Sequence, residues 1–175
     1  DNNPVPLSDL CCVSVSYWGF DDQVHQGAMI FHKIVAEEIV DIFKEIFVAR
    51  FPIQKMVFVD AYEGIDEKSA EDNNSYSFCT RPITMGTAFS KHSYGLAVDI
   101  NPLQNPYHRG DLVIPLSGAE YLDRDQQLKG MIQPNSSIYN AFVKRGWGWG
   151  GDWIPIKGYV DYQHFEKDPE VVLKR

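Results

Sequence analysis

We expect the chain to be organised around SKHSYGLAVD, residues 90–99, and a shorter stretch, DYQH, residues 161–164, complements it further along. The first stretch supplies His92 and Asp99. The second supplies His164 and, three residues before it, a further carboxylate. Two neutral histidine nitrogens and one aspartate oxygen are a suitable ligand set for a catalytic zinc ion, with the fourth position left to water.

The further carboxylate, Asp161, is not needed as a ligand and is free to accept the proton of that water. Its i, i+3 spacing from His164 suits a helical turn or a bulged strand. In a regular strand the two side chains would point to opposite faces of the sheet. The sequence leaves both geometries open.

On spacing alone, His92 and Asp99 are a weak pair, because a buried aspartate often just caps a turn. Three features favour a metal site. Gly95 between them permits a tight bend or a close backbone approach. Asp99 lies among apolar neighbours in residues 96–100, where an unpaired carboxylate is costly and a cation offsets the cost. Finally, the second stretch offers the missing ligand and the base.

Composition limits the class of protein. The 175 residues are enough for one domain, 1–175, with residues 1–10 as a polar, irregular lead-in. Asp and Glu number 24 against 16 Lys and Arg, for a net charge of −8. This balance argues against a nucleic-acid partner, which needs a basic face, and against docking on anionic membranes. No apolar run is long enough to span a bilayer.

The residue pattern predicts few long elements. Residues 12–18 alternate like a half-buried strand, residues 19–27 look like a polar turn, and an apolar stripe from about Ile30 predicts a helix that Pro52 ends. Residues 55–62 are predicted to form a strand. The polar passage 63–77 is either a flexible excursion or a functional loop.

The second half is expected to be similarly irregular. Residues 96–101 resemble a buried strand, and 112–125 a loop-rich segment. Ser136 or Ser137 is expected to cap a short helix that stops at Gly146. Strands and helices do not alternate regularly, so we predict an α+β fold with a small antiparallel sheet flanked by helices.

The cysteines leave two alternatives open. Cys11 and Cys12 are neighbours, which rarely bridge each other, and Cys79 lies far away. Either one of the first two bridges Cys79 and leaves an odd thiol, or all three are free. Because there is no Cys-x-x-Cys spacing, cysteine ligation of a metal is not expected.

These motifs resemble a known family. Residues 90–99 are similar to the Ser-x-His-x-x-Gly-x-Ala-x-Asp signature of the VanY-like D-alanyl-D-alanine carboxypeptidases, zinc peptidases that include VanX-type dipeptidases and phage L-alanyl-D-glutamate endopeptidases. Residues 161–165 resemble the closing acid-x-x-His motif, and Arg81 stands where the family has an upstream arginine. Residues 101–107 and 146–151 resemble a carboxypeptidase-like subgroup. The resemblance covers the chain from about Pro52 onward, and more loosely before it.

The resemblance implies a role for each matching residue. His92, Asp99 and His164 are expected to bind one zinc ion, Asp161 to act as general base, and Arg81 to steady the scissile carbonyl and its oxyanion. It also implies the small antiparallel sheet shared with the hedgehog signalling domain. Two alternatives stand beside these roles: Arg81 as an ion-pair partner of the acidic loop before it, and Asp161 as a residue that only orients a ligand histidine.

The function implied is a zinc metallopeptidase of bacterial wall peptides. A D-alanyl-D-alanine carboxypeptidase is expected first, an L-alanyl-D-glutamate endopeptidase second, and a catalytically inactive zinc-containing binding module third. The partner is then a peptidoglycan stem peptide, met by a monomer in the periplasm or outside the cell; this location follows from the substrate and not from any signal in the chain. A free substrate carboxylate needs a cationic or N–H pocket, for which Arg109 and Arg145 are candidates.

Overall fold

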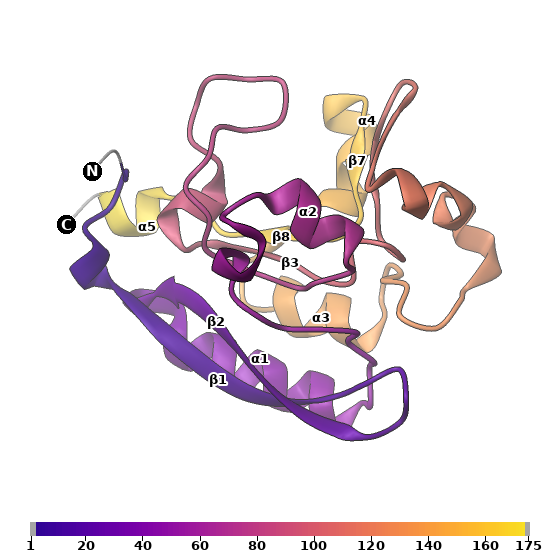
Figure 1. The fold of residues 1–175 in the computed structure, drawn as a ribbon, viewed down its shortest axis with the longest axis horizontal. Coiled ribbons are helices and arrows are strands. Elements are labelled where there is room, and N and C mark those ends of the chain that lie inside the picture. The colour runs from indigo at the N-terminus through magenta and orange to yellow at the C-terminus, as the bar shows by residue number, and fades with distance from the viewer. Residues whose placement is uncertain (1–2, 174–175) are drawn as a thin grey trace.

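The computed structural model describes residues 3–173, which form an α+β fold of small antiparallel sheets and short helices (Figure 1). The strands are β1 (Leu10–Trp18), β2 (Val24–His32), β3 (Ala97–Asp99), β4 (Tyr107–Arg109), β5 (Leu112–Ile114), β6 (Gly148–Trp149), β7 (Val160–Asp161) and β8 (His164–Glu166). The α-helices are α1 (Ala36–Val48), α2 (Asp66–Glu71), α3 (Ser137–Val143), α4 (Ile154–Lys157) and α5 (Glu170–Leu173). The 3₁₀ turns are η1 (Leu7–Asp9), η2 (Lys33–Val35), η3 (Val59–Tyr62), η4 (Lys91–Tyr94), η5 (Leu116–Tyr121), η6 (Arg124–Gln126) and η7 (Gly150–Trp153).

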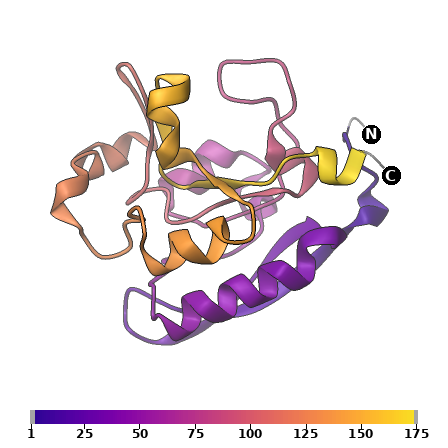
Figure 2. The same ribbon diagram turned by 180° about the vertical axis from the view of Figure 1, so that it is seen from behind.

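The first layer is the hairpin of β1 and β2, paired from Leu10 opposite His32 to Trp18 opposite Val24, with α1 running along it (Figures 1 and 2). The predicted strand at 12–18 is confirmed. The prediction of a turn through 27 and a helix from about Ile30 is wrong, because 24–32 is the second strand. The first half of this strand carries mainly polar and small side chains, without an apolar alternation that would mark it as a strand. Its pairing with β1 makes it one.

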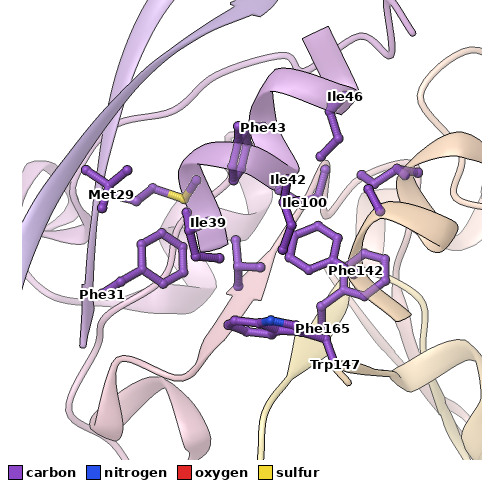
Figure 3. Close-up of a cluster of buried hydrophobic side chains, with 14 of the residues drawn as sticks. Met29, Phe31, Ile39, Ile42, Phe43, Ile46, Ile100, Phe142, Trp147 and Phe165 are labelled. Carbon is purple, nitrogen blue, oxygen red and sulfur yellow. The ribbon is translucent and has the colours of Figure 1, made fainter. Parts of the chain in front are cut away.

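The predicted helix is present as α1, after the 3₁₀ turn η2. Its stripe of Ile39, Ile42, Phe43 and Ile46 is buried, as the 3.6-residue period requires. On one side this stripe meets the hairpin, and on the other it meets a stack of Phe142 on Phe165 whose ring centroids are 4.1 Å apart (Figure 3). The helix ends at Val48, ahead of Pro52.

The second layer is a three-stranded sheet in the order β3-β8-β6, all antiparallel. β3 confirms the buried strand predicted at 96–101, and Tyr76 extends the sheet through a bridge to Asp99. The predicted short helix is α3: the Ser136 hydroxyl accepts from the Tyr139 N–H, and Gly146 is left-handed at φ 79°. A third sheet has the order β5-β4-β7.

The predicted strand at 55–62 is wrong. Lys55 forms only an isolated bridge with Asn74, and η3 follows at Val59. The side-chain amide of Asn74 accepts from the Val57 N–H and donates to the Val57 carbonyl, at 2.9 and 3.0 Å, so it occupies the groups that a strand neighbour would use. Nearby, the polar passage 63–77 contains α2, where the prediction had no regular element.

Three smaller expectations can also be compared with the structure. The loop-rich segment 112–125 begins with β5, which pairs with β4. In the lead-in 1–10, residues 1–2 lie outside the described residues, η1 forms a turn and β1 begins at Leu10. Cys11, Cys12 and Cys79 are all free thiols, which decides between the two alternatives. Within residues 3–173, no helix is long and apolar enough to cross a membrane.

Candidate metal centre and active-site cleft

His92, Asp99 and His164 converge in the interior, each at most 5% exposed. His92 Nε2 lies 3.2 Å from His164 Nδ1 and 3.2 Å from Asp99 Oδ1, and His164 Nδ1 lies 2.9 Å from that same oxygen. Tetrahedral ligands at about 2.0–2.1 Å from zinc are about 3.3 Å from one another. The donor set and its spacing therefore fit a metal ion of zinc's size and preference.

The register of the central sheet accounts for two of these ligands. Asp99 on β3 lies directly opposite His164 on β8, so their side chains are cross-strand neighbours on one face. His92 comes from η4, where the Ser90 side chain caps the turn by accepting from the His92 N–H. Gly95 ends the turn at φ 66°, and a Cβ there would lie 2.6 Å from the His32 nitrogen. The motif glycine thus serves both the bend and the close approach that the sequence suggested.

Each histidine is oriented by a hydrogen bond from its second nitrogen. Nδ1 of His92 donates to the Ser77 carbonyl, which leaves the Nε2 lone pair for a metal. Nε2 of His164 donates to Glu166 Oε2 at 3.1 Å, which directs Nδ1 toward Asp99. The ring of Tyr76 stacks on His92 with centroids 4.9 Å apart. Both imidazoles are therefore held in position before any metal binds.

Removing the partner of His164 tests this positioning. We expect Glu166→Ala to lower zinc affinity by about 10- to 100-fold, since the ring loses both its orientation and the neighbouring carboxylate. Glu166→Gln, which keeps an acceptor but not the charge, should fall between Ala and wild type. Affinities come from competition titration with a chromogenic chelator. The exposed Glu37→Gln on α1 is the control, and equal affinities for all four proteins would contradict the assignment.

The charges of the metal-free cluster compensate one another. Burial by itself would lower the pKa of His164, but hydrogen bonds with the carboxylates of Asp99 and Glu166 outweigh burial and raise that pKa to about 10. Burial would raise the pKa of Asp99, but His92 and His164 hold it well below its usual range. For His92, burial dominates and lowers the pKa. The metal-free site thus holds a carboxylate beside one imidazolium.

This protonation makes zinc binding depend on pH. Zinc needs the neutral imidazole, so binding must release the His164 proton, and below a pKa of about 10 affinity should rise about tenfold per pH unit. The same raised pKa stabilises the metal-free fold fully below about 6.5, the model-peptide value, and that stabilisation is lost as pH rises through 10. Calorimetry in buffers of different ionisation enthalpy measures the released protons. A zinc affinity that stays constant from pH 6 to 8.5 would contradict this protonation state.

Two of the three ligands line a cleft formed by two adjoining hollows, of about 530 and 350 Å³: Asp99 lines the larger and His164 the smaller. Arg81, Tyr107 and Asp161 line both hollows. The larger hollow we call the acidic arm; its own lining includes Asp66, Glu67, Tyr76, Asp99 and Gln163. The smaller we call the lysine arm; its own lining includes Ser90, Lys91, Trp153, Lys157, Tyr159, His164 and Glu166.

Asp161 stands where the two arms meet. It ends β7, and the two-residue turn at 162–163 then leads into β8, so the i, i+3 spacing spans neither a helical turn nor a bulged strand. Its Oδ1 is buried without a hydrogen-bond partner. Burial, opposed by His164 and reinforced by Asp99, raises the pKa of Asp161 to about 7. Ser77 and Glu166 orient the two histidines, which leaves this carboxyl group available for proton transfer near neutral pH.

A glycine allows Asp161 to lie there. A Cβ on Gly150 would lie 2.2 Å from the Asp161 carbonyl oxygen and 2.8 Å from its Cβ. Gly150→Ala should displace β7 and lower kcat by about tenfold or more while zinc stays bound, because misplaced catalytic groups lose rate steeply. The control is Gly148→Ala, whose Cβ meets only the Glu166 carbonyl, at 3.9 Å. A Gly150→Ala enzyme with wild-type kcat would show that the close approach has no bearing on catalysis.

Arg81 is both an ion-pair partner of the acidic passage and a lining residue of the cleft. Its Nε pairs with Asp66 Oδ2 at 2.5 Å, so it is an ion-pair partner of the acidic passage. Its Nη1 donates to the Pro82 carbonyl and its Nη2 to the Tyr76 hydroxyl, at 3.1 and 3.4 Å. Burial opposes its charge, but Tyr76 and Asp66 outweigh burial and raise the pKa of Arg81. A permanently charged guanidinium therefore faces the cleft next to Asp161.

A buried His-Asp-His cluster beside an unpartnered carboxyl group is the kind of arrangement with which hydrolases can activate water through a metal ion. Residues 84–167 match the profile of the D-alanyl-D-alanine carboxypeptidase family, over a segment that contains both motifs. This match supports the resemblance that the motifs had suggested. No curated protein and no solved structure matches the chain.

Sequence reasoning missed several residues of the site. Glu166 was detectable, because a residue two positions after His164 on a strand shares its face. Tyr76 gave no signal in the sequence, and Gly150 was noted only as part of the family-like stretch 146–151. Arg109 and Arg145, suggested for a substrate carboxylate, line neither arm. Arg145 pairs with Glu45 of α1, and Arg109 lies over the ring of Tyr159.

Proposed function

We propose that the protein is a zinc-dependent metallopeptidase that hydrolyses peptidoglycan stem peptides, and specifically a D-alanyl-D-alanine carboxypeptidase. The observation that carries this proposal is the three-ligand cluster with the unpartnered Asp161 oxygen in the same cleft, within the segment that matches the peptidase family. A purely structural zinc site would more often have four protein ligands and would need no free base.

His92 Nε2, Asp99 Oδ1 and His164 Nδ1 would hold the ion. When bound, zinc supplies Lewis acidity, which lowers the pKa of water toward about 7 and polarises a carbonyl. Asp161 then accepts the proton of the attacking water at its carboxylate and later delivers it to the departing amine. Its pKa of about 7 in the metal-free cleft reflects the burial that keeps bulk water from competing for this proton.

Arg81 stabilises the oxygen on which negative charge develops. Its guanidinium is fixed by Asp66 and the Tyr76 hydroxyl, so it needs little reorganisation as the charge appears. Such preorganised stabilisation is worth the most in a partly desolvated cleft. A peptidoglycan substrate would also require the protein to act in the periplasm or outside the cell.

Mass spectrometry of wall fragments tests the proposal. Soluble fragments carrying pentapeptide stems are incubated with zinc-loaded protein, with and without a chelator. The expected result is a chelator-sensitive loss of one terminal alanine. A cut between L-alanine and D-glutamate would overturn the carboxypeptidase assignment in favour of the endopeptidase. No cleavage with stoichiometric zinc bound would overturn the enzyme and favour a binding module.

A further inference from the structure

The two arms differ in the sign of the charged side chains that belong to only one of them. Apart from the residues that both arms share and the metal ligands, the acidic arm presents Glu67 and Asp66, the latter paired with Arg81, and no cation. The lysine arm presents Lys91 and Lys157 against one carboxylate, Glu166, which accepts a hydrogen bond from His164. A substrate anion entering the cleft is therefore repelled on one side of the metal cluster and attracted on the other.

Within the described residues the two ammonium groups form no close ion pair, although both attract the Glu166 carboxylate over a longer distance. Across the described residues 3–173, neither Lys91 nor Lys157 has a carboxylate within ion-pair distance, whereas Lys44, Lys144 and other surface lysines do. Lys157 instead lies with its Nζ 3.3 Å from the centroid of the Trp153 ring. A stacked ammonium keeps its charge and its capacity to donate hydrogen bonds to an anion.

The position of Lys157 sets the distance from the reacting bond. The Trp153 ring centroid lies 5.5 Å from that of His164, so the ammonium lies at most about 9 Å from a ligand ring. Within a peptide, a carbonyl carbon and the α-carboxyl carbon of the following residue are about 4 Å apart. The lysine arm is therefore within reach of the residue directly after a scissile bond that is held at the ligand cluster.

We propose that Lys91 and Lys157 form a subsite for the α-carboxylate of the residue on the leaving side of the scissile bond, and so select for substrates that carry this charge. The inference rests on the proposed peptidase function and deepens it. Two wall-peptide linkages offer this chemistry: a terminal D-alanyl-D-alanine, and an L-alanyl-D-glutamate bond in a stem linked through the γ-carboxyl. In both, the polarity of the cleft fixes the orientation of the peptide, with its leaving residue in the lysine arm.

The test compares peptides that differ only in this carboxylate. The zinc-loaded protein is given stem peptides ending in D-alanyl-D-alanine as the free acid or the amide, and stem peptides with the glutamyl α-carboxyl free or amidated. For the linkage that is cleaved, wild type should favour the free acid by about tenfold or more in kcat/KM. In Lys91→Gln/Lys157→Gln this ratio should fall close to one, mainly through KM, and Lys91→Arg/Lys157→Arg should restore it.

The control is Lys44→Gln on α1, far from the cleft, which should keep the wild-type ratio. General damage to the site lowers both rates and leaves the ratio unchanged, so the ratio reports the subsite alone. A readout without turnover is binding of N-acetyl-D-alanyl-D-alanine to the metal-free protein by calorimetry, where the double Gln variant should bind at least about tenfold more weakly. Cleavage with an unchanged acid-to-amide ratio in the double variant would overturn the subsite and leave the peptidase intact. Absence of cleavage of every peptide would overturn the proposed function, and calorimetry would then still decide the subsite.

Discussion

Asp161→Asn is expected to reduce kcat by about 10²- to 10⁴-fold while one zinc ion per chain stays bound. The substitution keeps the size of the side chain but removes the group that takes and returns the proton, and general acid–base catalysis is typically worth this much. Zinc should stay because Asp161 is not among the three donors of the cluster. Steady-state kinetics and metal analysis on the same preparation measure both effects. Asp152→Asn, an exposed position that accepts from the Tyr139 hydroxyl, is the control.

The same variant has a second signature in the metal-free protein. The pKa of Asp161 is raised by burial from 3.8 to about 7, so its ionisation costs stability that grows as pH rises from about 4 and is complete above 7. Asp161→Asn should therefore raise the melting temperature at pH 8 and leave it unchanged at pH 4. A variant that keeps more than about a tenth of wild-type kcat would exclude Asp161 as the base.

Asp99→Asn is expected to act on metal binding, whereas Asp161→Asn acts on turnover. Zinc affinity should fall by more than about a hundredfold, and turnover should be lost for lack of metal. An amide is a poor zinc ligand, and Asp99 supplies the only negative charge among the three donors. The metal-free protein should also lose about 3 kcal/mol or more at neutral pH, since removing one partner of a buried ion pair leaves the other uncompensated. Chelator competition and chemical denaturation measure these two losses.

Asp99→Asn should also weaken the pH dependence of zinc binding. The carboxylate of Asp99 is the main group that raises the pKa of His164, so without it the imidazole is largely neutral at pH 8 and releases fewer protons on binding zinc. If Asp99→Asn fails to fold, zinc affinity is measured instead in His164→Ala, which removes the other member of the buried Asp99–His164 pair. Wild-type zinc affinity in either variant would exclude this cluster as the metal site.

The donors of the candidate metal centre could be predicted from the sequence alone. Residues 90–99 and 161–164 carry the donors, and the family signature depends on residue types at fixed spacing, which a linear chain records directly. The long apolar stripe of α1 and the serine-capped, glycine-ended α3 were also predictable, because helices are built from contacts within a few residues.

Features that depend on pairing between distant segments could be seen only in the folded chain. β2 is a strand because β1 lies beside it, and 55–58 is not one because the Asn74 side chain takes the backbone hydrogen bonds of Val57. Likewise, Gly150 contacts Asp161, and Lys157 of α4 lines the same hollow as Lys91 of η4, across separations in the sequence that no local pattern encodes. Ligands can be identified from their chemistry, but the groups that orient them and the charges that select the substrate are set by packing between elements.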